Sequence, residues 1–413
     1  MKAHISTLKR SSLCAVAALL FAATTGCSDG PETSGGTTST GGSDGTGGAT
    51  STGGATSTGG AGGATATGGC LPDSATSALF TLAAADLCAV AVYTNGPAIE
   101  YQQPTWGSHG GPLLVAQGPG DGQVTLDRWT APAGASGDVT IASTTIDAKI
   151  PTGAFAGSEA LDLGFRAGTA ISYSGAFPDT AGELIIANGS DTSERYAVNA
   201  LFSIGALSAS GGASGGRVVY SGASPLGDAT AGANGLYAAD DCSGSFLPMG
   251  NATCAAPSKI AAWGDASGPV FADAAGNVFV VMTSFAGDQT ARAFAASTIG
   301  AGSLPAEGDE LFTLPGYGQS LAAIAPDGDA KGIVAFQPSD GASFEALDVL
   351  QIRYSVKDGT VTAEGAPSPL LTFPQTNTAT AMLTDPEGRL WVGVPVHEGD
   401  KTTTTFVVLA RKP

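Results

Sequence analysis

The chain has few basic residues. It contains 17 Lys and Arg against 36 Asp and Glu, and its formal net charge is −19 at pH 7. No Lys or Arg occurs between Arg10 and Arg128. Proteins that bind nucleic acid neutralise its phosphates with clustered Lys and Arg, and anionic membranes attract polybasic segments. We therefore expect no nucleic-acid partner, and the first third of the chain offers no polybasic membrane patch after Arg10.

Histidine and the common cofactor motifs are equally scarce. Only His109 and His397 remain once the N-terminal His4 is set aside. The sequence contains no glycine fingerprint for dinucleotides, no P-loop and no zincin motif. We therefore expect no cofactor and no metal.

Long apolar runs are also missing. The longest one, residues 13–23, follows Lys2, Lys9 and Arg10 and is too short to span a bilayer as a helix. A positive start before about a dozen apolar residues is typical of a secretory signal peptide. We predict that residues 1–26 are an export signal. Its removal takes away three of the 17 basic residues and leaves 14 against 36 acidic ones, a net charge of about −22.

Residues 24–27, Thr-Thr-Gly-Cys, resemble the lipobox of bacterial lipoproteins. In that family the cysteine is diacylated and becomes the new N-terminus. The resemblance implies lipidation of Cys27, which would anchor the chain in the cell envelope without a transmembrane helix. Ser28 in the next position favours the outer membrane. The alternative is an ordinary secretory signal cut near residue 22 or 23, which would export the chain without an anchor.

The segment 27–69 consists almost entirely of Gly, Thr, Ser and Ala. Between Ser28 and Gly69 it has no aromatic or basic residue, and its only charges are Asp29, Glu32 and Asp44. Such a composition cannot offset its conformational entropy by burial, so we predict a disordered tether. About 40 residues of this kind have an r.m.s. span of about 35 Å.

Four cysteines follow the tether. An even number in an exported chain predicts disulfides, here Cys70 with Cys88 and Cys242 with Cys254. A four-cysteine zinc site is the alternative, but neither pair has the Cys-x-x-Cys spacing that such sites favour.

Residues 70–413 are predicted to form one all-β region. Short apolar runs alternate with Gly, Pro, Asp and Asn, as in residues 278–282, 390–394 and 405–409. Helical periodicity is confined to residues 73–87, where Leu79, Leu82, Ala83 and Leu87 would share a face. That stretch could also simply lead into a strand at residues 88–93.

A turn followed by a strand recurs along this region. Residues 273–280 match residues 385–392: an Asp, a Gly three positions later, then apolar residues. Weaker copies place glycines at 122, 182, 235 and 328. The six glycines, with Gly276 and Gly388 included, are 60, 53, 41, 52 and 60 residues apart, which fits one four-stranded unit per repeat. In each turn the Asp side chain would cap the backbone and the Gly would adopt positive φ.

This pattern resembles β-propellers whose blades carry a D-x-x-G turn before an apolar strand. The resemblance implies six or seven blades, with the strand at residues 406–409 pairing with an N-terminal strand to close the ring. A pair of β-sandwiches is the alternative architecture.

One constellation suggests hydrolysis. Residues 212–216 satisfy G-x-S-x-G around Ser214, His109-Gly110-Gly111 looks like an oxyanion loop, and His397 follows in the right order. A nucleophile elbow needs a helix after the serine, however, whereas residues 208–216 read as a Gly/Ser loop before a strand at residues 217–220. We therefore treat this match as a chance product of the composition and assign no catalytic residue.

Other polar clusters are weaker. Asp327 and Asp329 resemble the start of a calcium loop, but Lys331 occupies a ligand position and no closing Glu follows. Asp240 and Asp241 beside Cys242 are read as a surface loop. Four tryptophans could stack on a sugar but are expected in the core: Trp106, Trp129, Trp263 and Trp391.

The sequence thus predicts a monomeric cell-envelope lipoprotein that displays a β-propeller for binding or scaffolding, with a protein or glycan ligand that it does not identify. The alternative is an exported propeller enzyme, a glycan lyase or hydrolase whose carboxylates converge at the central channel. Small residues at the channel would favour the binding module.

Overall fold

The computed structural model describes most of the chain beyond the predicted tether. The described residues are 69–97, 105–107, 111–116, 122–149, 155–162, 168–174, 183–188, 191–197, 203–212, 215–223, 235–240, 258–262, 270–273, 275–283, 288–300, 308–315, 317–324, 330–339, 345–375, 378, 380–385, 387–399 and 401–413. Within these ranges, no helix is long and apolar enough to cross a membrane.

We call the first three sheets the first to third blades. Each contains four antiparallel strands, and their order across the sheet is the order in which they occur along the chain. The first blade consists of β3 (Thr105–Gly107), β4 (Gly111–Ala116), β5 (Val124–Thr130) and β7 (Thr140–Ile146). The second consists of β8 (Phe155–Asp162), β9 (Thr169–Ser174), β10 (Glu183–Asn188) and β11 (Asp191–Ala197). The third consists of β12 (Ser203–Gly212), β13 (Gly215–Ala223), β14 (Gly235–Asp240) and β15 (Ser258–Ala262).

The other three sheets form the fourth to sixth blades, and two of them take strands from the N-terminal end. The fourth consists of β16 (Val270–Ala272), β17 (Val278–Thr283), β18 (Asp288–Phe294) and β19 (Asp309–Pro315), with helix α2 (Ala296–Gly300) before β19. The fifth consists of β20 (Tyr317–Ile324), β21 (Lys331–Ser339), β22 (Val349–Lys357), β23 (Thr360–Thr372) and β1 (Thr81–Leu82). The sixth consists of β24 (Ala381–Thr384), β25 (Leu390–Glu398), β26 (Lys401–Arg411), β2 (Leu87–Gly96) and β6 (Ser136–Asp138).

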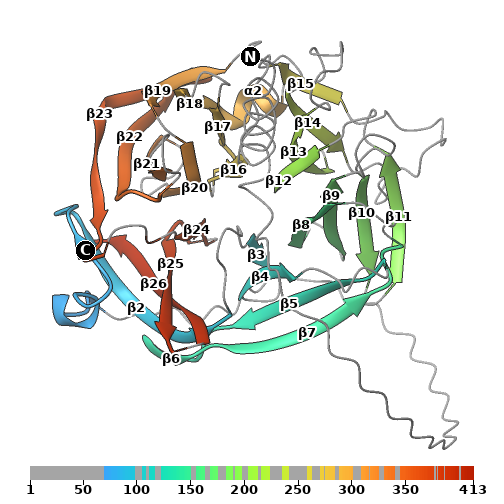
Figure 1. Ribbon diagram of the computed structural model, residues 1–413. Helices are drawn as coiled ribbons and strands as arrows, with labels where there is room; N and C mark the ends of the chain where they lie inside the picture. The colour runs from blue at the N-terminus through green and yellow to red at the C-terminus, as the bar shows by residue number, and fades with distance from the viewer. Residues whose placement is uncertain are drawn as a thin grey trace, which may run out of the picture.

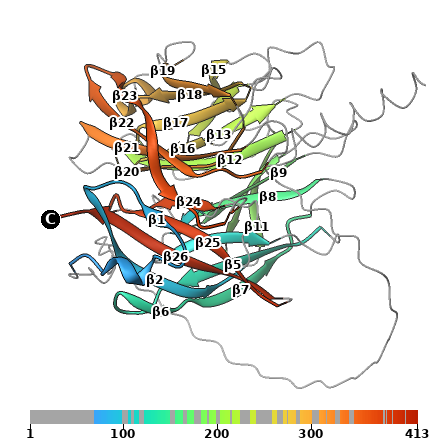
Figure 2. The same cartoon turned by 60° about the vertical axis from the view of Figure 1, so that its left-hand side comes forward.

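The six blades are arranged in a ring around a central axis (Figure 1). The innermost strands contact one another in turn: β3 with β8, then β12, β16, β20 and β24, and β24 again with β3. Figure 2 shows the same ring obliquely, with β2 and β23 brought forward. The predicted all-β propeller class is confirmed. The expected number of six or seven blades concerns the whole chain, and its described strands form six sheets.

The ring closes in the sixth blade, where the two ends of the folded region meet. β2 pairs antiparallel with β26, with Tyr93 opposite Phe406 and Val92 opposite Val407. The predicted pairing of the last strand with an N-terminal strand is therefore correct. Because β24, β25 and β26 come from the C-terminal end, backbone hydrogen bonds between distant parts of the chain hold the ring shut.

Apolar strand residues fill the spaces between blades. In β25, the five residues from Leu390 to Val394 are all buried, and Val278, Phe279 and Val280 of β17 are buried too. Both faces of a propeller sheet pack against neighbouring sheets. Successive residues of a strand point to opposite faces, so all residues of such a run are buried. Each fully buried Val, Leu or Phe contributes about 1.5–3 kcal/mol.

The turn glycines precede strands, as predicted, but they precede different strands in different blades. Gly122, and the weaker glycines at 182 and 235, lie just before or at the start of the third strand of their blades, whereas Gly276, the glycine at 328 and Gly388 precede the second strand. The unusually short spacing of 41 residues, between glycines 235 and 276, is where the register changes. Each of the six described sheets therefore has one of these glycines, but not at the same turn.

The segment before β2 is not the helix that its periodicity allowed. It contains a single 3-10 turn, η1 (Asp73–Ala75), and the two-residue strand β1. Phe80 and Ala84 are buried there, while Ala83 is exposed. The segment instead leads into the strand β2, which was the alternative prediction for residues 73–87. Packing against two blades, rather than a helical face, determines which residues are buried.

Candidate functional site

The centre of the ring is the natural place for a propeller's site, and its described strands carry little charge. The inner strands β3, β8, β12, β16, β20 and β24 surround the axis (Figure 1). Glu159 and Asp162, both on β8, are the only charged residues in these six strands. The remaining positions are mainly Gly, Ala, Ser, Thr and apolar residues.

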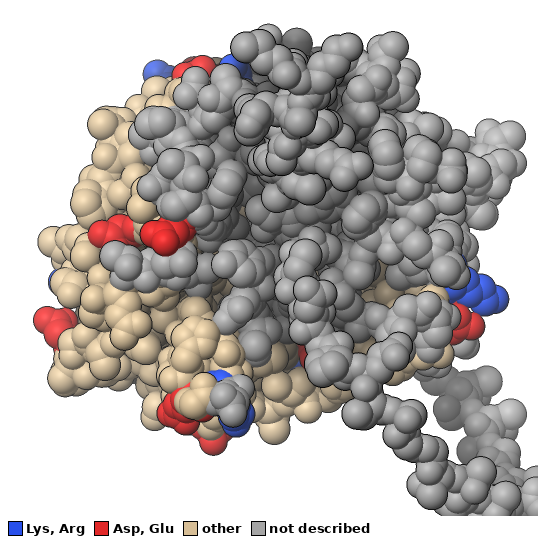
Figure 3. Space-filling view, in the orientation of Figure 1, with Lys and Arg blue, Asp and Glu red and all other residues tan. Residues whose placement is uncertain are grey.

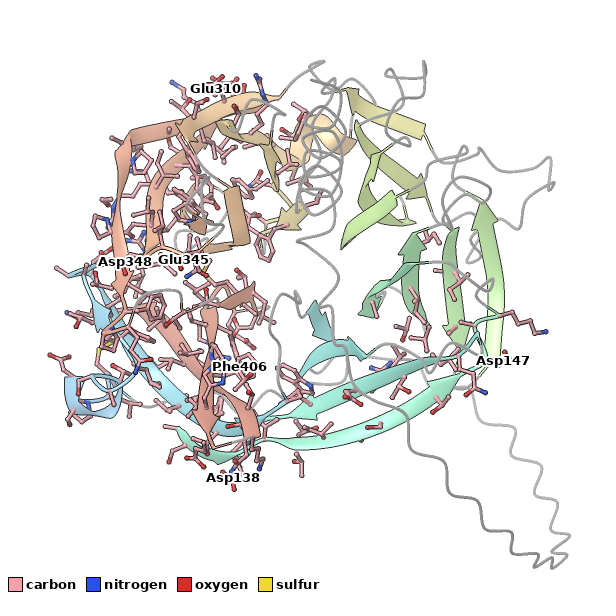
Figure 4. All side chains as sticks on the ribbon, viewed as in Figure 1. Asp138, Asp147, Glu310, Glu345, Asp348 and Phe406 are labelled. Carbon is pink, nitrogen blue, oxygen red and sulfur yellow. A yellow bond between two sulfur atoms is a disulfide. The ribbon has the colours of Figure 1, made fainter. Side chains whose placement is uncertain are left out.

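The charged side chains that the structure describes lie elsewhere. On the face shown in Figure 3, those of the described residues lie mainly toward the outer edge. Asp138, Asp147 and Glu310 are at the outer edge of the ring in Figure 4. Within the described part of the chain, no group of three or more His, Cys, Asp or Glu side chains is placed to hold a metal ion.

Asp385 occupies the turn between β24 and β25 and has a fully buried side chain. Its Oδ1 accepts the Arg389 backbone N–H at 2.8 Å, and its Oδ2 accepts Arg389 Nε at 2.6 Å and Trp391 Nε1 at 2.9 Å. The Gly388 N–H donates to the Asp385 carbonyl at 2.9 Å, and Gly388 has φ +76°. The Asp cap and the left-handed Gly are thus as predicted from the motif.

Asp273 repeats this arrangement between β16 and β17. Its Oδ1 accepts the backbone N–H groups of Ala275 and Asn277, at 3.0 and 2.9 Å, and Gly276 has φ +83°. Its Oδ2 accepts Asn277 Nδ2 at 2.8 Å and the Tyr354 hydroxyl at 2.6 Å. Tyr354 comes from β22, so this carboxylate joins the fourth and fifth blades.

Burial changes the acidity of this pair. It raises the pKa of Asp273 above its ordinary value, although hydrogen bonds from Tyr354 and Asn277 act in the opposite direction. Burial, with the nearby Asp273 charge, also raises the pKa of Tyr354. Acidic groups with shifted pKa values can mark active sites. Asp273 and Tyr354, however, are hydrogen-bonded to each other between two packed blades. Their geometry identifies them as structural.

A third acidic group, Asp86, was not singled out from the sequence. It lies between β1 and β2, and both of its oxygens accept Arg353 Nη2 at 2.8 Å. Arg411 Nη1 adds a contact to Oδ2 at 3.1 Å. Burial raises the pKa of Asp86, but the hydrogen bond and charge of Arg353 outweigh it and hold the pKa below its usual value. No local signal could have found this cluster, because its partners are 267 and 325 positions away.

The hydrolase constellation gains no support from the described residues. His397 lies near the end of β25, where its Nδ1 is 3.0 Å from Thr402 Oγ1 of the adjacent strand. His109 and Ser214 lie outside the described residues. The stretch 208–216, expected to be a loop, is strand through Gly212, and Gly212 pairs with Gly215 at the start of β13. A strand therefore follows the motif, as predicted, where a nucleophile elbow needs a helix.

The remaining predicted residues divide between core and undescribed segments. Trp129 and Trp391 are buried in the core, each beside Phe406, at ring-centroid distances of 4.6 and 6.3 Å. The predicted Cys70–Cys88 disulfide is present, with its Cα atoms 5.5 Å apart. Outside the described residues, or without described side chains, are Cys27, Trp106, Asp240, Asp241, Cys242, Cys254, Trp263, Asp327 and Asp329.

Comparisons with known proteins give no family. No protein-family model matches the chain, and no curated protein matches it. Solved structures with a similar arrangement include the PQQ-bound aldose sugar dehydrogenase of Streptomyces coelicolor, at 11% identity and a TM-score of 0.47, covering 78% of this chain and 98% of that one.

Two further solved structures are similar at the same level. A mutant of AofleA from Arthrobotrys oligospora is 13% identical, with a TM-score of 0.38, covering 78% of this chain and 90% of that one. The α-L-arabinofuranosidase of Lactobacillus brevis is 11% identical, with a TM-score of 0.35, covering 77% and 89%. At these identities and TM-scores, the similarities assign no activity to this chain.

Proposed function

We propose that this chain is an exported, lipid-anchored binding module: Cys27 carries the lipid, residues 27–69 form the tether, and residues 70–413 form the propeller that binds a ligand at the cell envelope. The observation that supports binding over catalysis is the composition of the inner strands. Inner strands composed mainly of small and apolar residues fit a module that holds a ligand by shape and backbone hydrogen bonds. Glycosidic bond cleavage instead uses two carboxyl groups flanking the scissile bond.

The Cys70–Cys88 disulfide is compatible with the extracytoplasmic location. Structural disulfides form and persist in oxidising compartments and are rare in the cytosol. The lipid anchor itself rests on the motif at residues 24–27 and on the tether composition.

The anchor is tested by fractionation of cells that express the full chain. Cys27→Ser is expected to move the protein from the membrane fraction to the soluble or secreted fraction. Cys14→Ser is the matched control, since it changes the same residue type inside the predicted signal and leaves the lipobox intact. Unchanged membrane association of Cys27→Ser would refute the lipoprotein assignment.

Binding is tested with the mature full chain on a glycan array and in pull-downs from envelope extracts. The binding module predicts retention of a ligand that is recovered chemically unchanged. Release of new reducing ends or of unsaturated sugars would contradict it.

The second candidate is a propeller enzyme acting on glycans. Its specific observation is the presence of two carboxylates, Glu159 and Asp162, on the innermost strand β8. They are three positions apart in a regular stretch of strand and so lie on opposite faces, which means that at most one of them can serve a given site. If turnover occurs, one of Glu159→Gln and Asp162→Asn should abolish it, while Asp138→Asn at the outer edge should not. Turnover that survives both inner substitutions would exclude both residues as catalytic carboxylates.

A further inference from the structure

The first described residues form a closed loop across one seam of the ring. The Cys70–Cys88 disulfide joins the beginning of the described chain to the second residue of β2. β1, which lies between the two cysteines, pairs with β23 of the fifth blade. β2, which contains Cys88, pairs with β26 of the sixth blade. The loop at residues 70–88 therefore touches both blades and starts and ends at one covalent bond.

The loop inserts an aromatic side chain into the seam. Phe80 is 1% exposed and belongs to a core cluster that includes Leu371 of the fifth blade and Leu390 of the sixth. Its ring lies edge-on to that of Phe373, with centroids 6.3 Å apart. The Ala83 N–H donates to the Leu370 carbonyl at 2.8 Å, which holds this part of the loop against β23.

Charged groups cross the same seam. Asp86 accepts hydrogen bonds from Arg353 of β22 in the fifth blade and from Arg411 of β26 in the sixth. The Lys412 backbone N–H donates to the Asp86 carbonyl at 2.9 Å. The loop thus contacts the C-terminal end of the chain as well as both blades.

We propose that residues 70–88 act as a covalently closed clasp, in which the Cys70–Cys88 disulfide passes tension arriving from the N-terminal side directly into β2. This inference rests on the proposed function, because only a tethered domain that holds a ligand would receive such tension. The predicted tether enters at the cysteine itself, since residue 69 directly precedes it.

The reason lies in what would resist tension without the bond. Force entering at residue 70 would act first on the single hydrogen bond from the Leu71 N–H to the Ala89 carbonyl of β2, at 2.8 Å. It would then act on η1 and on the two residues of β1, and these hydrogen bonds would break one after another. With the bond in place, the force reaches β2, which has ten residues and pairs with both β26 and β6. The clasp residues are then bypassed, and the Phe80 side chain stays in the seam.

Single-molecule force spectroscopy on the mature full chain, held by its two ends, tests the clasp. The double variant Cys70→Ser/Cys88→Ser should show an early, low-force extension of about 60 Å, the length of the freed residues, before the ring unfolds. The untreated protein should lack this step, and the same protein in reductant should show it. Asp86→Ala, which keeps the disulfide, should lack the early step.

A single unfolding event in the double variant, with those residues released together with the ring, would overturn the proposal. β1 and Phe80 would then resist force unaided. Circular dichroism and thermal unfolding of the variant establish that it is folded before it is pulled. The clasp and the lipid anchor can fail separately. An early step in Cys70→Ser/Cys88→Ser, together with release of Cys27→Ser from membranes, supports both proposals. The same early step with unchanged membrane association of Cys27→Ser refutes only the lipid anchor.

Discussion

At the scale of single residues, Asp385 and Glu387 both pair with Arg389, but they differ in burial. The Asp385 side chain is 0% exposed and also accepts Trp391 Nε1, whereas that of Glu387 is 41% exposed. Asp385→Ala removes the acceptor of three donors, the Arg389 N–H, Arg389 Nε and the buried Trp391 Nε1, and should lower the free energy of unfolding by about 3 kcal/mol. Glu387→Ala is the matched control and should cost less than about 1 kcal/mol. Urea unfolding measures both, and equal losses would contradict the structural role of Asp385.

Asp273 and Asp86 should make stability depend on pH in opposite directions. The pKa of Asp273 is raised, mainly by burial, so its contribution is fully present below 3.8 and is lost as pH rises through the raised pKa. The pKa of Asp86 is lowered by Arg353 in spite of burial, so its contribution is present above 3.8 and is lost as pH falls through the lowered pKa.

The two variants Asp273→Asn and Asp86→Asn test these signs. We expect the stability advantage of the natural protein over Asp273→Asn to shrink as pH increases from about 3 to 6. Its advantage over Asp86→Asn should grow over the same range. Urea titrations at several pH values give the two slopes, and slopes of the same sign would show that one assignment is wrong.

The turns could be predicted from the sequence, and the seam contacts could not. In the Asp273 turn, the caps reach Ala275 and Asn277, two and four positions away, so a short motif encodes them. The Tyr354 bond to the same carboxylate spans 81 positions. Nothing near Asp273 in the sequence identifies that partner, because only the packing of two blades creates the contact.

At the scale of elements, the end of β2 fits closely against β26. A Cβ at Gly96 would lie 2.8 Å from Phe406 Cε2 and 3.0 Å from the Thr404 carbonyl oxygen. Gly96→Ala should therefore destabilise the protein by about 1–3 kcal/mol. Gly399→Ala is a useful comparison, since its Cβ would meet no atom within 4 Å and only its φ of +63° opposes it.

A double-mutant cycle with Phe406→Leu separates the two causes at Gly96. If the ring is the obstacle, Gly96→Ala should cost less in the Phe406→Leu background than in the natural chain. An unchanged cost would assign the strain to the backbone contact with Thr404 instead. Thermal and urea unfolding of the four proteins provide the cycle.

Element types were well predicted, and their places in the blades were not. Residues 278–282, 390–394 and 405–409 all lie in strands, as their apolar runs indicate. The turn glycines, however, precede the third strand in the first half of the ring and the second strand in the other half. An Asp-Gly turn specifies a hairpin wherever it occurs, so it cannot say which pair of strands it joins.

At the scale of the whole molecule, closure of the ring depends on the last strand. β26 pairs with β25 on one side and β2 on the other, and Phe406, Val407, Val408 and Leu409 are all at most 1% exposed. A chain ending at residue 400 should lose cooperative unfolding and expose apolar surface. A chain ending at residue 411 should keep cooperative unfolding and a buried core, at a cost of about 1 kcal/mol for the lost Lys412 hydrogen bonds to the Asp86 and Ala85 carbonyls. Near-ultraviolet circular dichroism and size-exclusion chromatography compare them, and cooperative unfolding of the shorter chain would contradict this role.

The sequence by itself determined the all-β class, the turn chemistry, the Cys70–Cys88 pairing and the closing role of the last strand. The first three depend on periodicity, on residue types within a few positions, or on cysteines that are close in the chain. The closing role of the last strand follows from the resemblance to β-propellers. Only the tertiary structure decided the register of the blades, the burial of Phe80 and the partners of Asp86 and Asp273. Those depend on contacts between segments up to 325 positions apart, and such contacts exist only once the ring brings the two ends of the chain together.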